Sequence, residues 1–160
     1  MKWFSYPAGI VVGLVVLAVV AWGVYAAAKP GGSTYVDPAH RFSVQLPGPI
    51  TTKDYPADDG SSDTVVLDDG SGGEVQITIT PWDDSGSVLT KEAAERQYSS
   101  ISDLDVEAIP VAGVFGLAFE DSKINESDVW FARGGYLYQL IARGDNTTMQ
   151  SEAVAGWKFY

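Results

Sequence analysis

The hydrophobic pattern divides the chain into one continuous apolar run and a longer part in which apolar and polar residues alternate. From Ala8 to Ala28 nearly every residue is apolar, and no charged residue occurs between Lys2 and Lys29. A helix rises about 1.5 Å per residue, so this run just spans a hydrocarbon core of roughly 30 Å. The pattern predicts a single transmembrane helix that anchors residues 1–28 in a membrane.

A cleaved signal peptide is the alternative for this run, because Ala26, Ala27 and Ala28 offer small residues to a signal peptidase. The apolar core of a signal peptide usually covers about 7–15 residues, so the length favours a retained anchor. Lys2 and the α-amine together outnumber Lys29, which favours an N-terminus inside. We therefore expect a single-pass cell-membrane protein with an extracytoplasmic domain, or a secreted domain after cleavage near Ala28.

Beyond the apolar run, the pattern is typical of a linker followed by one soluble domain. Residues 29–38 are rich in Gly, Pro and Ser without periodicity, which indicates a linker before a domain over residues 39–160. Phe42–Leu46 and Val75–Ile79 alternate with a period of two, as strands buried on one face do. Shorter extended pieces are expected at Thr51–Tyr55, Thr64–Leu67 and Val114–Glu120.

Helical spacing occurs at two places in the domain. Thr90 can cap a helix over Lys91–Ile101, because its side-chain oxygen can accept a hydrogen bond from the first helical turn. Ala94, Tyr98 and Ile101 lie on one face of this helix. A second helix is expected over Thr147–Trp157, with a buried stripe of Met149, Ala153 and Trp157.

The segment Val129–Arg143 predicts a β-hairpin, since Gly134-Gly135 suits a two-residue turn with positive φ at both positions. Both faces of this hairpin are mostly apolar, so both must be covered. The turn fixes the pairing on each face: Phe131 with Tyr138, Val129 with Leu140, Trp130 with Gln139 and Ala132 with Leu137.

Two covered faces and two helices favour an α+β fold. We expect an antiparallel sheet of about six strands flanked by helices, an α/β/α sandwich, with the hairpin near its centre. A β-sandwich, in which the second cover is another sheet, is the alternative. The two helical segments make it the less favoured one.

Several sequence features resemble PsbP-like domains. The order Tyr35, Phe42-Ser43-Val44 and Leu46-Pro47 is similar to the start of these domains. A helix before a Gly-rich strand and the closing unit with Leu137–Leu140 and Trp157–Tyr160 are also similar. The resemblance implies an antiparallel sheet between helices. It also implies a binding or assembly role like that of the photosystem subunit and the anchored bacterial members, which share no common catalytic site.

Charge and cysteine content narrow the function classes. All 21 acidic residues lie from Asp37 onward, against eight of the ten basic residues, which gives this part a net charge of 8 − 21 = −13. Such a surface repels phosphate backbones, so nucleic acid is not an expected partner. The chain has no cysteine, which excludes disulfides, thiolate metal sites and a cysteine nucleophile.

The sequence marks no catalytic, cofactor or metal residue. His40 is the single histidine and is expected to have a surface or capping role, and without a second His or Cys no transition-metal set is present. Neither a Gly-x-Ser-x-Gly elbow nor a phosphate-binding loop occurs. The remaining candidates are carboxylates in turns, which usually cap turns but could bind calcium: Asp58, Asp59, Asp63, Asp68, Asp69, Asp83 and Asp84.

These observations predict a membrane-anchored extracytoplasmic binding or assembly module, tethered through Ala8–Ala28, with a protein partner in the cell envelope. The alternatives are a hydrolytic enzyme with a carboxylate and hydroxyl site, and a calcium-binding envelope protein. A deep pocket with converging polar groups of shifted pKa would favour the enzyme. A flat surface with exposed apolar residues would favour the binding module.

Overall fold

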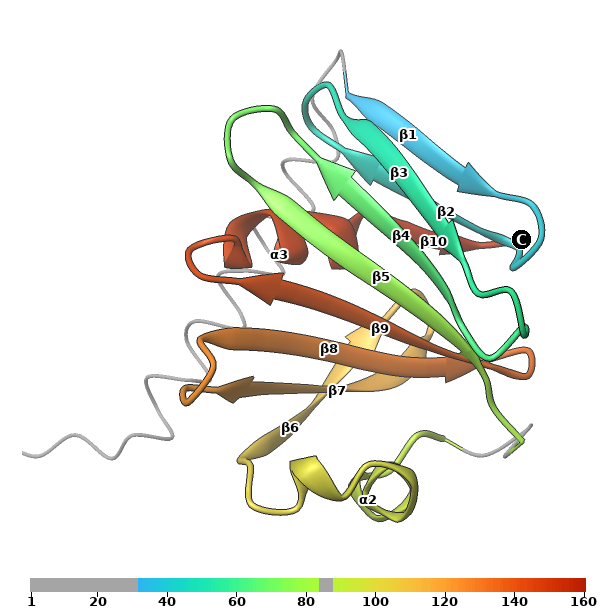
Figure 1. Ribbon diagram of the computed structural model, residues 1–160, viewed down its shortest axis with the longest axis vertical. Coiled ribbons are helices and arrows are strands. Elements are labelled where there is room, and N and C mark those ends of the chain that lie inside the picture. The colour runs from blue at the N-terminus through green and yellow to red at the C-terminus, as the bar shows by residue number, and fades with distance from the viewer. Residues whose placement is uncertain (1–31, 84–87) are drawn as a thin grey trace, which may run out of the picture.

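A computed structural model describes residues 32–83 and 88–160, and these residues form a small, mostly β domain (Figure 1). Two helices, α2 (Lys91–Gln97) and α3 (Thr147–Ala155), and one 3-10 turn, η1 (Ser99–Ile101), lie among the strands. The described strands are β1 (Ser33–Asp37), β2 (Phe42–Leu46), β3 (Thr51–Pro56), β4 (Asp63–Asp68), β5 (Glu74–Pro81), β6 (Val106–Val111), β7 (Val114–Asp121), β8 (Glu126–Arg133), β9 (Tyr136–Arg143) and β10 (Trp157–Phe159).

The strands form two antiparallel sheets. The larger sheet has seven strands in the order β3-β4-β5-β9-β8-β7-β6, and the smaller has three in the order β1-β2-β10. The predicted hairpin is confirmed as β8 and β9, near the centre of the larger sheet. Its register is confirmed as well, with Phe131 opposite Tyr138 and Trp130 opposite Gln139. Gly134 and Gly135 have φ of 64° and 86°, as the two-residue turn requires.

The main core lies between the two sheets. Inward-facing residues of β2, β5, β8 and β9, such as Val44, Ile77, Phe131 and Leu140, are fully buried. Trp157 of the smaller sheet packs flat against Phe42, with ring centroids 4.3 Å apart. The prediction of an α/β/α sandwich with about six strands is therefore wrong. A second sheet, with α3 beside it, covers this face, because Phe42–Leu46 pairs with β1 and β10 rather than joining the central sheet.

A second core covers part of the opposite face of the larger sheet. Trp130 and Leu137 of the hairpin pack there with Leu117 of β7 and with Ala94 of α2. Among the described residues, this core includes none from β3, β4 or β5. Helix α2 lies at the β6–β7 end of the sheet in Figure 1, so neither of the two described helices covers the outer side of β3–β5.

Both helices are shorter than the pattern predicts. Thr90 caps α2 as expected, accepting a hydrogen bond from the Ala93 N–H at 3.2 Å. Helix α2 ends at Gln97, because Tyr98 has φ of −130° and ψ of 86° and so leaves the helical conformation. The stripe Met149, Ala153 and Trp157 is buried as predicted. Trp157 nevertheless belongs to β10, since α3 ends at Ala155.

The hydrophobic pattern does not predict three of the strands. Strand β1 occupies Ser33–Asp37, inside the stretch expected to be a linker. Strand β6 contains Pro110, whose missing N–H is tolerated because β6 is an edge strand paired with β7 alone. Strand β10 has three residues, too few to show a period.

The expectation of a membrane protein needs a correction. Within residues 32–83 and 88–160, no helix is long and apolar enough to cross a membrane. The predicted transmembrane helix, Ala8–Ala28, lies outside the described residues. The single-pass and membrane assignments therefore receive no support from the structure.

Candidate functional site

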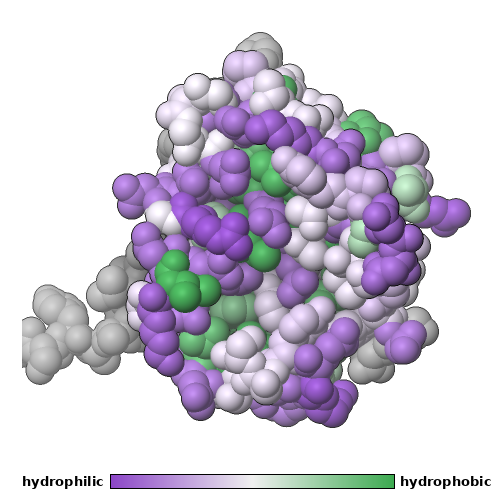
Figure 2. All heavy atoms as spheres, viewed as in Figure 1, coloured by the Kyte–Doolittle hydropathy of each residue, from purple (hydrophilic) through white to green (hydrophobic). Residues whose placement is uncertain are grey.

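The outer side of β3, β4 and β5, together with the neighbouring ends of β8 and β9, forms a surface that we call the open face. Inward positions of β4 and β5 are almost completely buried, whereas their outward positions remain partly exposed. Hydrophilic residues cover most of the surface visible in Figure 2, and hydrophobic residues lie among them in patches. The open face is made of Lys53, Tyr55, Thr64, Val66, Asp68, Glu74, Gln76, Thr78, Glu126, Ile141 and Arg143.

Hydrogen bonds order the side chains of this face across three strands. The Arg143 Nη1 donates to Gln76 Oε1 at 3.3 Å, and Gln76 Nε2 donates to Thr78 Oγ1 at 3.1 Å. Arg143 Nε also lies 2.9 Å from Glu126 Oε2, its direct partner across the hairpin. The open face is thus a polar surface with partly fixed side chains.

Glu126 and Asp128 form a carboxyl pair at the border of the open face. Asp128 is 4% exposed, and its Oδ1 accepts a hydrogen bond from the Trp130 indole Nε1 at 2.9 Å. The Glu126 carboxyl group lies near enough to raise the pKa of Asp128. Strand alternation explains the geometry, because Glu126, Asp128 and Trp130 point to the same side of β8.

Burial raises the pKa of Asp128 from 3.8 to about 7. The Trp130 hydrogen bond acts in the opposite direction, and the charge of Glu126 raises the pKa further. The positive charge of Arg143 lowers it. Asp128 therefore exchanges a proton near neutral pH, which is where a group that responds to a ligand's charge needs to titrate.

Gln139 of β9 lies near the carboxyl pair, between the core under α2 and strand β5. It stands opposite Trp130 on one side and opposite Thr78 on the other. Gln139 is 7% exposed. Its amide atoms are not among the fully buried side-chain N and O atoms that lack a hydrogen bond, a group that in residues 32–83 and 88–160 contains Trp157 Nε1 alone.

His40 belongs to a second polar cluster, which holds the β1–β2 turn against β4 and β9. Its Nδ1 lies 2.8 Å from Asp37 Oδ2, and its Nε2 lies 3.3 Å from Asp63 Oδ2. The His40 carbonyl accepts a hydrogen bond from the Tyr138 hydroxyl at 2.9 Å, and its ring meets Tyr136 edge-on. The contact with Asp37 lies within the β1–β2 turn, and the others link this turn to β4 and β9, so His40 has a structural position.

The acidic loop residues mostly cap their own turns. Asp59 accepts from the Ser61 N–H at 3.0 Å, and Asp68 accepts from the Gly70 N–H at 2.7 Å. Asp69 accepts from backbone N–H groups of its own turn, and these bonds hold its pKa below the ordinary value. Within residues 32–83 and 88–160, no group of three or more His, Cys, Asp or Glu residues could hold a metal ion.

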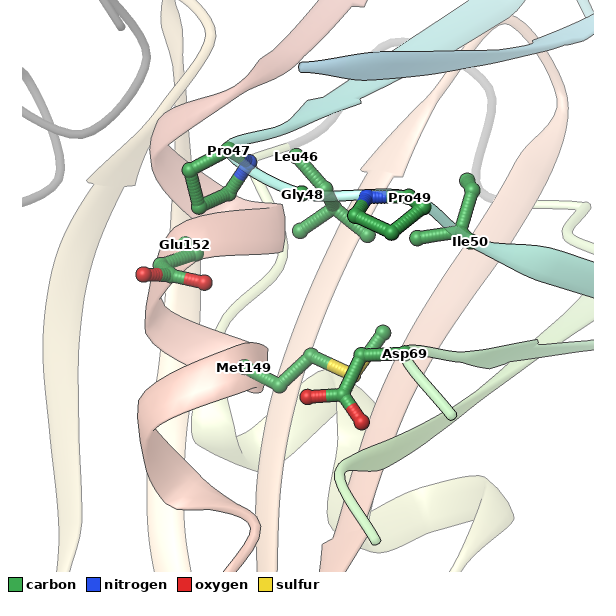
Figure 3. Close-up of a pocket in the computed structure, with 8 residues that line it drawn as sticks. All are labelled: Leu46, Pro47, Gly48, Pro49, Ile50, Asp69, Met149 and Glu152. Atoms are coloured by element: carbon green, nitrogen blue, oxygen red, sulfur yellow. The ribbon is translucent and has the colours of Figure 1, made fainter. Parts of the chain in front are cut away.

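A cavity of about 270 Å³ lies away from the open face (Figure 3). The β2–β3 connection, Leu46–Ile50, forms one wall, and Met149 and Glu152 of α3 form another. Asp69 lines it as well, with its carboxylate engaged by its own turn. None of its lining residues belongs to the carboxyl pair, so the cavity and the shifted pKa of Asp128 lie at different places.

Sequence reasoning named none of the residues at this site. It counted Trp130 and Gln139 as parts of a covered hairpin face and gave Glu126 and Asp128 no role. The signal was present in the predicted register, which places Glu126 directly opposite Arg143. Two acidic residues at alternate positions of a central strand are unusual, because charged residues are rarely buried without a partner.

Comparisons with known proteins do not assign a family. No family model matches the chain, and no curated protein matches it. Among solved structures, the chain is similar to a GTP binding regulator (TM1622) from Thermotoga maritima, with a TM-score of 0.38 and 8% sequence identity over 86% of this chain and 87% of that chain. A likeness of this size carries no argument about function. Residues 32–83 and 88–160 form a small β-rich domain by their own strand content, and the PsbP-like resemblance is not confirmed.

Proposed function

We propose that this chain is a non-catalytic binding module that docks a protein partner on the open face. The observation that carries the proposal is the incomplete cover of the larger sheet: among residues 32–83 and 88–160, α2 and its core include no residue of β3, β4 or β5. Tyr55, 54% exposed at the edge of this surface, is an aromatic side chain of the kind that anchors protein interfaces.

The charge of the chain suggests a basic partner. Residues from Asp37 onward carry a net charge of 8 − 21 = −13. On the open face, Asp68, Glu74 and Glu126 outnumber the basic residues Lys53 and Arg143. Attraction between complementary charges speeds association, and salt screens this attraction. The on-rate of the partner should therefore fall as the ionic strength rises.

The proposal can be tested by adding a long cation to one exposed position. Thr64→Arg places this charge on the open face, between Tyr55 and Thr78, and Ser43→Arg places the same charge on the outer side of the smaller sheet. Proteins captured by the full-length wild type and by each variant are compared quantitatively. We expect Thr64→Arg to lose a partner that Ser43→Arg retains, whereas equal capture by both variants would contradict the proposal.

An acid–base enzyme is the second candidate, and the carboxyl pair favours it. A carboxyl group with a pKa of about 7 could donate and accept protons near neutral pH. None of the residues that line the cavity of about 270 Å³ belongs to the carboxyl pair, so this cavity does not place a substrate beside Asp128. Turnover of a hydrolase substrate that Asp128→Asn abolishes in a folded protein would favour the enzyme.

A further inference from the structure

Strand β3 forms one edge of the larger sheet, and its free side is open. Among residues 32–83 and 88–160, β3 pairs with β4 alone. All six residues of Thr51–Pro56 are exposed, whereas β6, at the opposite edge of this sheet, contains the buried residues Ile109 and Val111. The free side of an edge strand presents backbone N–H and carbonyl groups to which another strand can bond.

The hydrogen bonds at the β3–β4 turn show which residues of β3 face this free side. The Ala57 N–H donates to the Ser62 carbonyl at 3.2 Å, so the backbone of Ala57 faces β4, and the same register continues along β3. In an antiparallel pair, residues alternate between facing the partner strand and facing away from it. The backbones of Thr52, Asp54 and Pro56 therefore face away from β4. Pro56 is consistent with this alternation, because proline is tolerated where the N–H position of an edge strand points to solvent.

These three residues leave a row of backbone groups for a further strand. Thr52 and Asp54 each present an N–H and a carbonyl, and Pro56 presents a carbonyl. In the part of the chain that the structure describes, none of these groups bonds to the backbone of a turn, a loop or another strand. The row can therefore bond to the backbone of an extended segment without displacing any described element.

A second copy of this chain does not suit this edge. Two antiparallel registers give the longest overlap of the free sides: they pair residues 51–55, or residues 52–56, with the same residues of the copy. The first register places Lys53 opposite Lys53 of the copy, and the second places Asp54 opposite Asp54. Like charges directly opposite each other destabilise a strand pair, so these two residues disfavour self-pairing.

The side chains of β3 indicate which strand fits the edge. Lys53 and Asp54 are exposed neighbours of opposite charge, so a fitting strand has an acidic residue opposite Lys53 and a basic residue opposite Asp54. Tyr55 is 54% exposed and can pair with a β-branched or aromatic residue. Lys53 and Tyr55 belong to the open face, so an added strand extends that face.

We propose that the free side of β3 binds one extended segment of the partner that docks on the open face, as an added antiparallel strand. The inference rests on the proposed function and adds the way in which the partner is held. Backbone hydrogen bonds to Thr52, Asp54 and Pro56 hold the segment, and its charges opposite Lys53 and Asp54 determine the register. Because the strands run in opposite directions, the segment has a basic residue followed directly by an acidic residue.

The test uses the blocked hexapeptide acetyl-Thr-Val-Arg-Glu-Thr-Val-amide as the probe and the full-length chain in solution NMR. In the proposed register its arginine lies opposite Asp54 and its glutamate lies opposite Lys53. We expect saturable shifts of the Thr52 and Asp54 amide signals, and slower hydrogen exchange at both amides. A peptide with the arginine and glutamate exchanged has the same composition and should bind about fivefold more weakly, because like charges then lie opposite each other.

Two proline variants compare the two edges of the larger sheet. Thr52→Pro removes one donor from the free side of β3 and should weaken binding by about fivefold or more, as expected for the loss of one backbone hydrogen bond. Ala108→Pro, at an exposed position of β6, is the matched control and should bind the peptide as the wild type does. Val111 pairs with Val114 across a two-residue turn, so the alternate residues Pro110 and Ala108 face the free side of β6.

A charge exchange tests the same site without altering the backbone. Lys53→Glu combined with Asp54→Lys exchanges the two charges at exposed positions of β3. This double variant should reverse the preference, binding the exchanged peptide about fivefold more tightly than the original peptide. An unchanged preference would contradict the proposed register.

Three further results would each overturn the strand site: no saturable shifts at Thr52 and Asp54, equal affinity of the wild type for the two peptides, or equal affinity of Thr52→Pro and Ala108→Pro. Exchange at the Thr52 amide that slows with protein concentration, without peptide, would show a second copy at this edge and would also overturn it.

The outcomes separate this inference from the proposed function. If no peptide binds but Thr64→Arg loses a partner that Ser43→Arg retains, the docking face stands without the strand site. If the peptide binds as expected but Thr64→Arg and Ser43→Arg capture equally, the strand site stands and the docking face is wrong.

Discussion

Replacing Asp128 by Asn should change how the stability of the protein depends on pH. The folded state holds the Asp128 pKa at about 7, against an ordinary value of 3.8, because burial disfavours the charged form. Between these two values the folded protein binds more protons than the unfolded chain, so the free energy of unfolding falls as the pH rises. Below about pH 4 and above about pH 7 this contribution is constant.

The size of the effect follows from the two pKa values. Their difference corresponds to at most about 4 kcal/mol, at about 1.4 kcal/mol per pKa unit. Asn keeps the shape of the side chain, and its carbonyl oxygen can still accept from the Trp130 indole, but it cannot ionise. Asp128→Asn should therefore gain stability relative to the wild type across this interval, by up to about 4 kcal/mol.

Urea denaturation of both proteins at a series of pH values measures this difference directly. Asp58→Asn, at an exposed loop position, is the matched control and should follow the wild type throughout. A difference between Asp128→Asn and wild type that stays constant with pH would refute the raised pKa. A difference that shrinks as the pH rises would show that Asp128 is stabilised as a carboxylate.

Two further substitutions test the packing of the sheets. Tyr138→Phe removes the hydroxyl that bonds the His40 carbonyl and should lower the free energy of unfolding by about 1 kcal/mol; an unchanged value would show that this bond contributes nothing. Gly156→Ala places a methyl group against the Gln45 backbone and should cost about 2 kcal/mol or more. Gly48→Ala meets no atom within 4 Å and should stay within about 0.5 kcal/mol, so equal losses at both glycines would contradict the account.

The sequence predicted local structure well where a turn or a cap fixed it. The Gly134-Gly135 turn determines the hairpin register, and Thr90 determines where α2 begins. The pattern of Phe42–Leu46 shows which side of a strand is buried, but it contains no information on which sheet the strand joins. Because of that ambiguity, the pattern predicted a sheet covered by helices, whereas the structure has two packed sheets.

The spacing of hydrophobic residues could not predict the candidate site, for a related reason. Gln139 occupies an outward position of a hairpin whose other outward residues are mostly apolar, so the pattern predicted a covered face there and gave Asp128 no role. Only the position of α2, which reaches Trp130 and Leu117 but no residue of β3–β5, shows where the cover ends. That position depends on packing between segments far apart in the chain, which no local pattern records.

Photo-crosslinking from a single side chain is the most direct test of the docking face. A photoreactive amino acid is placed at Thr64 of the open face in one full-length protein, and at Ser43 of the smaller sheet in another. Both positions are partly exposed strand residues, so they differ mainly in the surface they sample. The account predicts a covalent adduct with a protein partner from Thr64 and none from Ser43. An adduct from Ser43 alone would contradict it.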